Sequence, residues 1–268
     1  VSGEQKQELE GADNISLVDA SYPTVTFFEL NTNKGIFKDI NVRKAMILSI
    51  DRDELVEVTD GMIKPAYSLI IDSMQNYNAD ASADFEENFA NDPEAAKKLL
   101  EEAGWVDSDG DGIREKDGQK LSFTWYTWSS ATRRAEKMSA QLKKVGFDMQ
   151  IETLDWNYMY EKIENDEYDA GIRELGWAEP ILVLDACYKD PNAPGKTDAY
   201  FKMVDEIAAE PDSDKRTEMV GEIQTKYLFK NLDLIPLCAE LSFEAYSSSL
   251  KNYVVLKDGS HVWNDLSY

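Results

Sequence analysis

The segment of residues 92–121 constrains the fold of this chain most, because it marks both ends of a helix and the turn behind it. It reads DPEAAKKLLEEAGW followed by DSDGDGIREKDGQKL. The Asp92 carboxylate can cap the helix, and Pro93 fits the first helical position, where no N–H is needed. Gly104 can adopt the left-handed conformation that ends a helix. Apolar side chains then share one face of the helix, at Ala96, Leu99, Leu100 and Ala103.

Strand-like and helix-like stretches interchange through the middle of the chain. Residues 120–128 alternate in strand fashion, helical spacing follows up to Gly146, and residues 147–151 alternate again. A helix capped by Asp155 comes next, followed by a strand over residues 168–175. This interchange predicts an α/β fold with a mixed sheet flanked by helices.

Other segments of the chain predict two further strands, two helix starts and a surface loop. Residues 15–20 and 24–30 are rich in β-branched and aromatic side chains, which predicts strands. Asp51 and Glu54 have the spacing of a capping box at the start of a helix. Residues 64–85 contain many turn formers, which predicts an irregular surface loop, and Ser213 is placed to cap a later helix.

Composition and charge exclude several classes of function. The 268 residues are 43% hydrophobic, which suffices for a substantial core, and no apolar run approaches the roughly 20 residues that span a bilayer. The net charge of −24 repels nucleic acid and anionic lipid. The chain opens without Met or a signal segment, so we expect a processed chain or an internal fragment.

Motifs for catalysis are missing from the sequence, which predicts that the chain is not an enzyme. His261 is the one histidine, and the chain has no HExxH, P-loop or GxGxxG in a strand–helix context. Cys187 and Cys238 have neither CxxC nor metal-ligand spacing. A disulfide and a buried reduced pair both explain these two cysteines.

An acidic loop resembles a calcium-binding loop in part. Asp107, Asp109 and Asp111 stand at alternate positions with Gly112 next. The twelfth position is Gly118, where a bidentate Glu is needed. Bound Ca²⁺ and a plain Asp-Gly turn therefore stay open, and the turn is the preferred interpretation. No other cofactor is expected.

Six stretches, in order along the chain, carry a family resemblance. They are LNTNKGIFKDINVRKAMILSIDRDELV, PAYS, DPEAAKKLLEEAGW, AQLKKVGFDMQIETLDWNYMYEKIENDEYDA, LGWAEP and IPL. Together they resemble the family 5 extracellular solute-binding proteins, the receptors of ABC importers for oligopeptides, dipeptides, nickel and related ligands. The resemblance implies a periplasmic-binding-protein-like lobe of type II, cluster C. Because the family's chain is about twice as long, it also implies the C-terminal half of a truncated two-lobe protein.

The resemblance also implies domain boundaries. Residues 1–31 would be an incoming segment and hinge-crossing strand, and residues 32–233 the second ligand-binding lobe. Residues 234–268 would be the return crossing and a tail that belongs to the absent first lobe. The two crossings are expected at residues 27–31 and 234–237.

Site residues follow from the same resemblance. Gly176, Trp177 and Glu179 match the place where peptide-binding relatives carry Gly-Trp and an acid that pairs with the ligand's N-terminal amine. Relatives usually leave a longer gap before the acid, which is Asp, so amine recognition and a solvated loop residue both stay open for Glu179. Trp177 would offer the ligand a flat apolar wall.

Four further residues are candidates for the ligand site. Tyr67, Tyr126 and Trp128 would be additional walls or else core and surface residues. Asn31, at the presumed crossing, would hold ligand backbone or satisfy a strand end.

The resemblance implies the substrate-binding component of an ABC importer, which captures peptides outside the cytoplasm by hinge closure and delivers them to the permease. The same receptor for a sugar, a nickel chelate or another small solute is one alternative, and a sensing module without transport is another. The implied partners are the permease subunits and the missing N-terminal lobe. The implied location is the periplasm or the cell surface, with a lipid anchor upstream of Val1.

Overall fold

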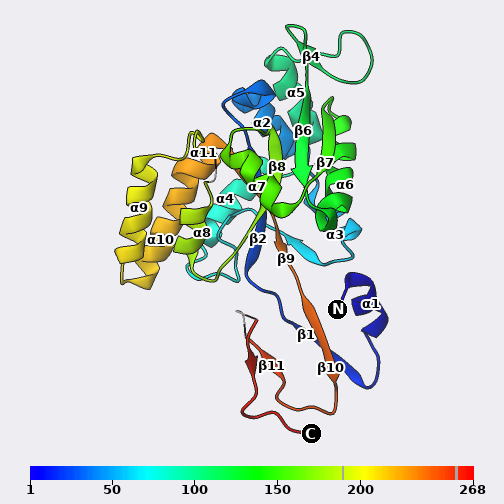
Figure 1. Cartoon of the computed structure of the whole chain (residues 1–268), viewed down its shortest axis with the longest axis vertical. Helices are drawn as coiled ribbons and strands as arrows, with labels where there is room; N and C mark the ends of the chain where they lie inside the picture. The colour runs from blue at the N-terminus through cyan, green and yellow to red at the C-terminus, as the bar shows by residue number, and fades with distance from the viewer. Residues whose placement is uncertain (189, 257–258) are drawn as a thin grey trace.

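A six-stranded mixed sheet organises the main body of the computed structural model, which describes residues 1–188, 190–256 and 259–268 (Figure 1). Strand β2 pairs antiparallel with both β8 and β9, whereas β6 pairs parallel with β7 and β8. The predicted mixed sheet is therefore confirmed. In sheet order the strands are β3 (Ile63–Pro65), β9 (Leu234–Glu240), β2 (Thr24–Leu30), β8 (Ala170–Gly176), β6 (Ser122–Thr127) and β7 (Asp148–Thr153).

Four strands of this sheet end at the same edge. Because β8 and β9 both run antiparallel to β2, they run in the same direction as each other. Strands β6 and β7 share that direction through their parallel pairing with β8. We call the edge where β6, β7, β8 and β9 end the carboxyl edge of the sheet. Strand β2 begins at this edge.

A narrow β ribbon continues from the carboxyl edge away from the main body (Figure 1). Strand β1 (Ile15–Asp19) pairs antiparallel with β10 (Phe243–Ser247), and α1 (Gly3–Leu9) precedes them. Strands β11 (Val254–Val255) and β12 (His261–Val262) form the last hairpin. Residues 27–30 and 234–237 lie inside the main sheet, and the chain leaves that sheet before Thr24 and after Glu240. The predicted lobe boundaries stay a prediction.

Helices cover both faces of the sheet. Side chains of β2 alternate between the two faces: Phe28 and Leu30 join one buried cluster, and Val25 and Phe27 join the other. The first cluster includes residues of α2 (Ile40–Leu48), α3 (Arg52–Val58), α5 (Pro93–Glu102) and α6 (Thr132–Lys143). The second includes residues of α8 (Pro180–Ala186), α9 (Asp198–Ala209) and α10 (Ser213–Ile223).

Shorter elements complete the body. Helix α7 (Trp156–Glu164) covers a third, smaller cluster around Tyr126. The others are η1 (Gly35–Lys38), α4 (Ala79–Phe89), the β4 (Glu115–Lys116) and β5 (Gln119–Lys120) hairpin, η2 (Ser129–Ala131), the π-helical turn η3 (Gln224–Leu228) and α11 (Phe229–Asn231). Within the described residues, none of the helices has both the length and the apolar character needed to cross a membrane.

The helix that starts after Asp92 is confirmed. Helix α5 begins at Pro93, and the Asp92 carboxylate accepts the Ala95 N–H at 2.9 Å. Gly104 follows the helix with φ of +87°, in the left-handed region that glycine adopts freely. The predicted cap of α7 by Asp155 is confirmed as well.

The surface loop predicted over residues 64–85 is wrong in three respects. Residues 64–65 belong to β3, residues 79–85 belong to α4, and Leu69 and Ile70 are fully buried. The irregular backbone tolerates burial because the Gln224 side-chain oxygen accepts the N–H groups of both residues, at 2.9 and 3.3 Å. Gln224 comes from the π-helical turn after α10, far away in the sequence.

Two helix caps in the structure differ in detail from the predicted ones. Asp51 accepts N–H groups from Asp53 and Glu54, but its own N–H donates to Gln141 rather than to Glu54. The tertiary contact with α6 thus replaces half of the capping box. Helix α10 is capped by Asp212, one residue before the predicted Ser213.

A fully buried ion pair joins β2 to β8. The Arg173 Nη1 donates to Glu29 Oε2 at 2.6 Å and to the Cys187 carbonyl at 2.6 Å. The Arg173 and Glu29 side chains are 0% and 1% exposed. Glu29 Oε1 also accepts the Asp190 N–H at 3.1 Å. The pair therefore connects the centre of the sheet with the end of α8 and the segment that follows it.

We expect Arg173→Met to lower the free energy of unfolding by about 3–5 kcal/mol, because it leaves the Glu29 carboxylate buried without its partner. Urea unfolding followed by circular dichroism measures the change. Arg133→Met is the control, since Arg133 pairs with Asp60 on the surface and should cost less than about 1 kcal/mol. Equal effects of the two substitutions would contradict a structural role for the buried pair.

Cys187 and Cys238 are both free thiols. They belong to different buried clusters, on opposite faces of the sheet. Of the two explanations, two buried reduced cysteines are therefore correct, and a disulfide is not. The Cys187 Sγ lies 3.1 Å from the Tyr200 hydroxyl, and the Cys238 Sγ lies 3.2 Å from Arg134 Nη1. Burial raises the pKa of each thiol to about 12.

We expect the denatured chain to titrate two thiols with Ellman's reagent in the absence of reductant. The native chain should react far more slowly, because both sulfurs are buried and protonated at neutral pH. A denatured chain that shows free thiols only after reduction would overturn this assignment.

Candidate functional site

Three of the four strands that end at the carboxyl edge are each followed by a tryptophan. Trp128 comes directly after β6, Trp177 comes directly after β8, and Trp156 starts the helix after β7. Trp156 and Trp177 are 38% and 37% exposed. Ligands of α/β sheets generally bind outside the carboxyl ends of the strands. The carboxyl edge is therefore the candidate ligand-binding face.

Two of these tryptophans form part of an aromatic cluster. The ring centroids of Trp128 and Trp156 lie 4.6 Å apart, and those of Trp156 and Tyr160 lie 5.0 Å apart, with the rings tilted against each other by 49° and 36°. The contacts between the rings hold these side chains in place, and exposed aromatic faces suit the apolar walls of a ligand site.

A hollow of about 410 Å³ lies beside this aromatic cluster, where the chain passes between the sheet and the ribbon. We call it the edge hollow. Its lining combines aromatic, hydroxyl and charged side chains from both connections to the ribbon and from the ends of β6, β8 and β9. The lining residues are Tyr22, Thr24, Trp128, Ser130, Arg134, Glu174, Glu240, Leu241 and Ser242.

Three charged residues meet in the edge hollow. Arg134 of α6 contacts Glu240 through Nη1, and its Nη2 lies 3.8 Å from Glu174 Oε1. The Thr26 hydroxyl lies 2.6 Å from Glu240 Oε1 and 3.4 Å from Glu174 Oε1. Two carboxyl groups thus share one guanidinium and one hydroxyl donor.

Burial first, and the neighbouring Glu240 charge second, raise the pKa of Glu174 to about 7. Arg134 and the Thr26 hydroxyl act in the opposite direction. Glu174 can therefore change its protonation state near neutral pH, as groups in ligand sites often do.

A second hollow of about 260 Å³ lies beside the end of β9. Tyr67, Tyr77 and Glu86 are among the residues that line it. The Arg52 guanidinium lies 4.7 Å from the centre of the Tyr67 ring. Ala239 of β9 lines this hollow, and the next residue lines the edge hollow. The structure therefore places Tyr67 in a different hollow from Trp128.

The predicted Gly-Trp-acid motif lies at the carboxyl edge. Gly176 pairs with Thr24, and a Cβ at this glycine would lie 2.8 Å from the Thr24 hydroxyl, which explains the need for glycine. Glu179 caps α8 by accepting the Ile181 N–H, and its carboxylate pairs with Arg216 of α10. Its charge is thus already engaged within the chain.

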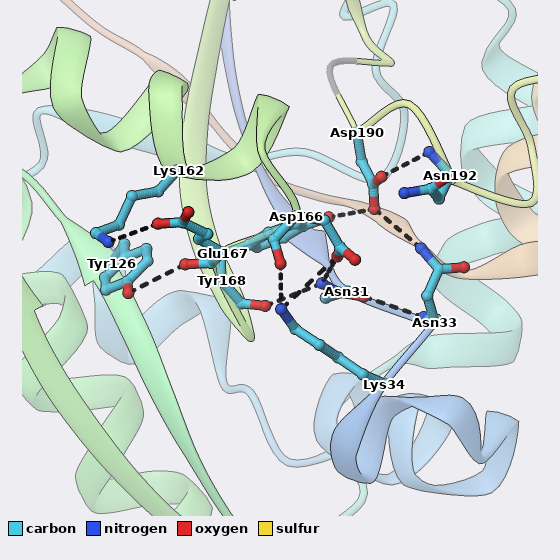
Figure 2. Close-up of polar contacts among 10 residues, drawn as sticks. All are labelled: Asn31, Asn33, Lys34, Tyr126, Lys162, Asp166, Glu167, Tyr168, Asp190 and Asn192. Atoms are coloured by element: carbon cyan, nitrogen blue, oxygen red, sulfur yellow. Dashed lines mark hydrogen bonds and ion pairs between the residues drawn. The ribbon is translucent and has the colours of Figure 1, made fainter.

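Asn31 lies at the opposite end of β2, away from the carboxyl edge. Its side-chain amide donates to the Tyr168 carbonyl at 3.0 Å and to the Asp166 carboxylate, and its oxygen accepts the Asn33 N–H (Figure 2). These hydrogen bonds satisfy polar groups at the end of β2. About 20 Å of strand separates Asn31 from Trp177, so the structure does not bring these two candidates together.

Tyr126 is a core residue beneath α7. It is 8% exposed, and its hydroxyl donates to the Glu167 carbonyl at 3.3 Å (Figure 2). Its ring packs with Met159, Ile163 and Tyr168.

The acidic loop of the β4–β5 region has a different arrangement from the predicted one. Carboxylate oxygens of Asp107, Asp109 and Glu115 lie within 4.8 Å of one another, while Asp111 pairs with Lys120. Asp107 accepts two backbone N–H groups of the turn, at 2.8 and 3.0 Å. The geometry is that of a hydrogen-bonded Asp-Gly turn, and calcium binding here stays a prediction.

Among the residues of the carboxyl edge that sequence reasoning missed, four have aromatic or charged side chains that matter for the site. They are Arg134, Trp156, Glu174 and Glu240. The sequence contained a signal for Trp156, because it follows soon after the strand predicted over residues 147–151. The three charged residues had no such signal, because they come from α6, β8 and β9 and meet only in the folded chain.

Comparisons with known proteins place the chain in a family. The model of the bacterial extracellular solute-binding proteins, family 5 Middle, matches residues 1–191. The oligopeptide-binding protein AppA of Bacillus subtilis is 32% identical over 63% of this chain and 31% of its own length. The dipeptide-binding protein of Escherichia coli is 24% identical over 95% of this chain and 47% of its own length. The chain thus spans about half the length of these relatives, or less.

Solved structures share the fold. The structure of NikA from Brucella suis in complex with Fe(III)-EDTA superposes with a TM-score of 0.85 at 22% identity, over 100% of this chain and 55% of that one. The structure of AppA from Bacillus subtilis in complex with a nonapeptide gives 0.74 at 22% identity, over 97% and 53%. The chain has the fold of a periplasmic-binding-protein lobe, and it belongs to the bacterial extracellular solute-binding proteins of family 5.

Proposed function

We propose that this chain is the C-terminal lobe of a substrate-binding protein that captures peptides outside the cytoplasm for an ABC importer. The observation that carries the proposal is the carboxyl edge, where a tryptophan follows each of three strand ends and one of them, Trp128, lines the edge hollow. Relatives with peptide-binding names, and a neighbour of similar fold in complex with a nonapeptide, support peptides as the ligand.

In this proposal the ligand is enclosed between the carboxyl edge and a first lobe supplied by the rest of the natural chain. The connections over residues 20–23 and 241–242 would act as hinges, because they join two paired regions, the main sheet and the ribbon. A ligand that contacts both lobes would shift the population toward the closed form that the permease recognises.

The aromatic side chains would supply the walls of the peptide site. Trp128, Trp156 and Trp177 offer flat faces to ligand side chains or backbone. Gly176 and Glu179 stay proposed contacts at the same edge. The lobe would act by binding and closure without catalysis, and the parent chain would be held outside the cytoplasm by an upstream anchor.

A small chelate is the second candidate ligand. The likeness to a structure that holds Fe(III)-EDTA favours it, since that neighbour covers the whole of this chain. The polar and charged lining of the edge hollow suits a small polar solute of neutral or positive charge as well as a peptide.

We expect native mass spectrometry of the gently purified natural chain to show a ladder of added masses that differ by amino-acid increments. In the same chain, Trp128→Ala should weaken binding of a tetra-alanine peptide about tenfold, because it removes an aromatic wall of the site. Isothermal titration calorimetry measures the affinity. Tyr158→Ala is the control, since Tyr158 is exposed on α7.

A single sharp added mass, in place of a ladder, would favour a small solute over peptides. Unchanged affinity in Trp128→Ala, with peptides still bound, would remove Trp128 from the site.

A further inference from the structure

Within the edge hollow, the negative charge exceeds the positive charge. When both carboxyl groups are ionised, Glu174 and Glu240 contribute two negative charges against the single positive charge of Arg134. A net negative charge in a partly buried hollow favours binding of a cationic group, because the surrounding protein screens the attraction between the charges less than water does.

The burial of the three groups decides which of them a ligand can reach. The Arg134 side chain is 5% exposed, whereas Glu174 and Glu240 are 25% and 29% exposed. Arg134 Nη1 already contacts Glu240 and the Cys238 sulfur. The guanidinium is therefore nearly buried in the wall of the hollow, and the two carboxylates are the more accessible charged groups.

One oxygen of each carboxylate is left for a ligand. Across the described part of the chain, the side-chain hydrogen bond to Glu174 ends on its Oε1. The side-chain hydrogen bonds to Glu240 also end on its Oε1. The two Oε2 atoms can thus accept charge-assisted hydrogen bonds from an incoming N–H donor.

Aromatic side chains line the same hollow. Trp128 and Tyr22 stand beside the carboxylates, and aromatic faces attract ammonium and guanidinium groups. An anionic group would meet two carboxylates and a guanidinium that is already paired. The lining thus selects by charge as well as by shape.

We propose that Glu174 and Glu240 form a cation-selecting subsite in the edge hollow, so that preferred ligands place an ammonium or guanidinium group there. This inference rests on the proposed function, because it takes the edge hollow as part of the ligand site. The cation can be the amino terminus of a peptide or a Lys or Arg side chain.

Protonation of Glu174 modulates the subsite. The groups that face it are Arg134 from α6, Glu240 from β9, Thr26 from β2 and Tyr160 from α7. Since burial and Glu240 raise the pKa of Glu174 to about 7, the carboxylate gains its charge as the pH rises through neutrality. Affinity for a Lys-containing ligand should therefore rise between about pH 6 and 8, where the Lys side chain stays charged.

The test measures affinities of the complete natural chain by isothermal titration calorimetry at about pH 7.5, where most of Glu174 is ionised and most peptide amino termini are still protonated. Three comparisons isolate the charge: tetra-alanine against its N-acetyl form, Ala-Lys-Ala-Ala against Ala-Gln-Ala-Ala, and putrescine against 1,4-butanediol. The first two distinguish an amino terminus from a side chain as the source of the cation. We expect the charged member of at least one pair to bind about 10- to 100-fold tighter.

The isosteric variants Glu174→Gln and Glu240→Gln should reduce this preference to a few-fold or less. Glu174→Gln leaves the contact between Arg134 and Glu240 intact, so it should fold even if Glu240→Gln does not; thermal unfolding checks both. It should also abolish the rise in affinity between pH 6 and 8. Glu152→Gln is the matched control, because Glu152 is an exposed acid near the end of β7 and should keep the preference.

The outcomes separate the two proposals. Peptide binding without any preference for charge would overturn the subsite and leave the peptide receptor intact. Preference for putrescine without peptide binding would support the subsite and overturn the peptide function. A preference that survives Glu174→Gln and Glu240→Gln, or no binding of any probe, would overturn the subsite.

Discussion

The two backbone ladders of β2 are the constraint on which the rest of this structure depends. Strand β2 pairs with β8 along its whole length, from Thr24 to Leu30, and with β9 on its other side. Every residue after Thr24 is buried. A strand covered on both faces has no water to satisfy its polar groups. Its two buried polar side chains, Thr26 and Glu29, must therefore find partners within the protein.

These two side chains meet their partners on opposite faces of the sheet, with different consequences. Glu29 pairs with Arg173 in a fully buried site, where the ion pair holds the sheet to the helix that follows β8. Thr26 reaches Glu174 and Glu240 at the carboxyl edge, where the carboxylates stay partly exposed. The same chemical need thus gives a fully buried pair in one place and a partly exposed group in the other.

The direction of the strands explains where the candidate site lies. Because β8 and β9 both oppose β2, their carboxyl ends meet those of β6 and β7 at one edge. The chain connects to the ribbon at the same edge. Side chains from four strand ends and two connections therefore converge there, although they are far apart in the sequence. Asn31 and Tyr126 lie elsewhere in the fold, and their side chains are used within the protein.

The sequence alone determined the elements whose signals are local. The helix after Asp92, its end at Gly104, the cap at Asp155 and the alternation of strands follow from neighbouring residues, so periodicity and capping rules predicted them. The α/β fold and the family resemblance came from the same local motifs. Features that depend on distant partners were missed, such as the buried segment held by Gln224 and the Asp51 N–H bonded to Gln141.

Only the tertiary structure decided how the charged residues are used. From the sequence, Glu174 and Glu240 are two among 52 acidic residues, and nothing in their neighbours marks them. Their pairing with Arg134 and their partial exposure arise from the register of β2 against β8 and β9 and from the packing of α6. Glu179, which the family motif singled out, is engaged by Arg216 for the same kind of reason. Local rules fix which elements form, whereas the charge a site presents depends on contacts between elements that no local pattern contains.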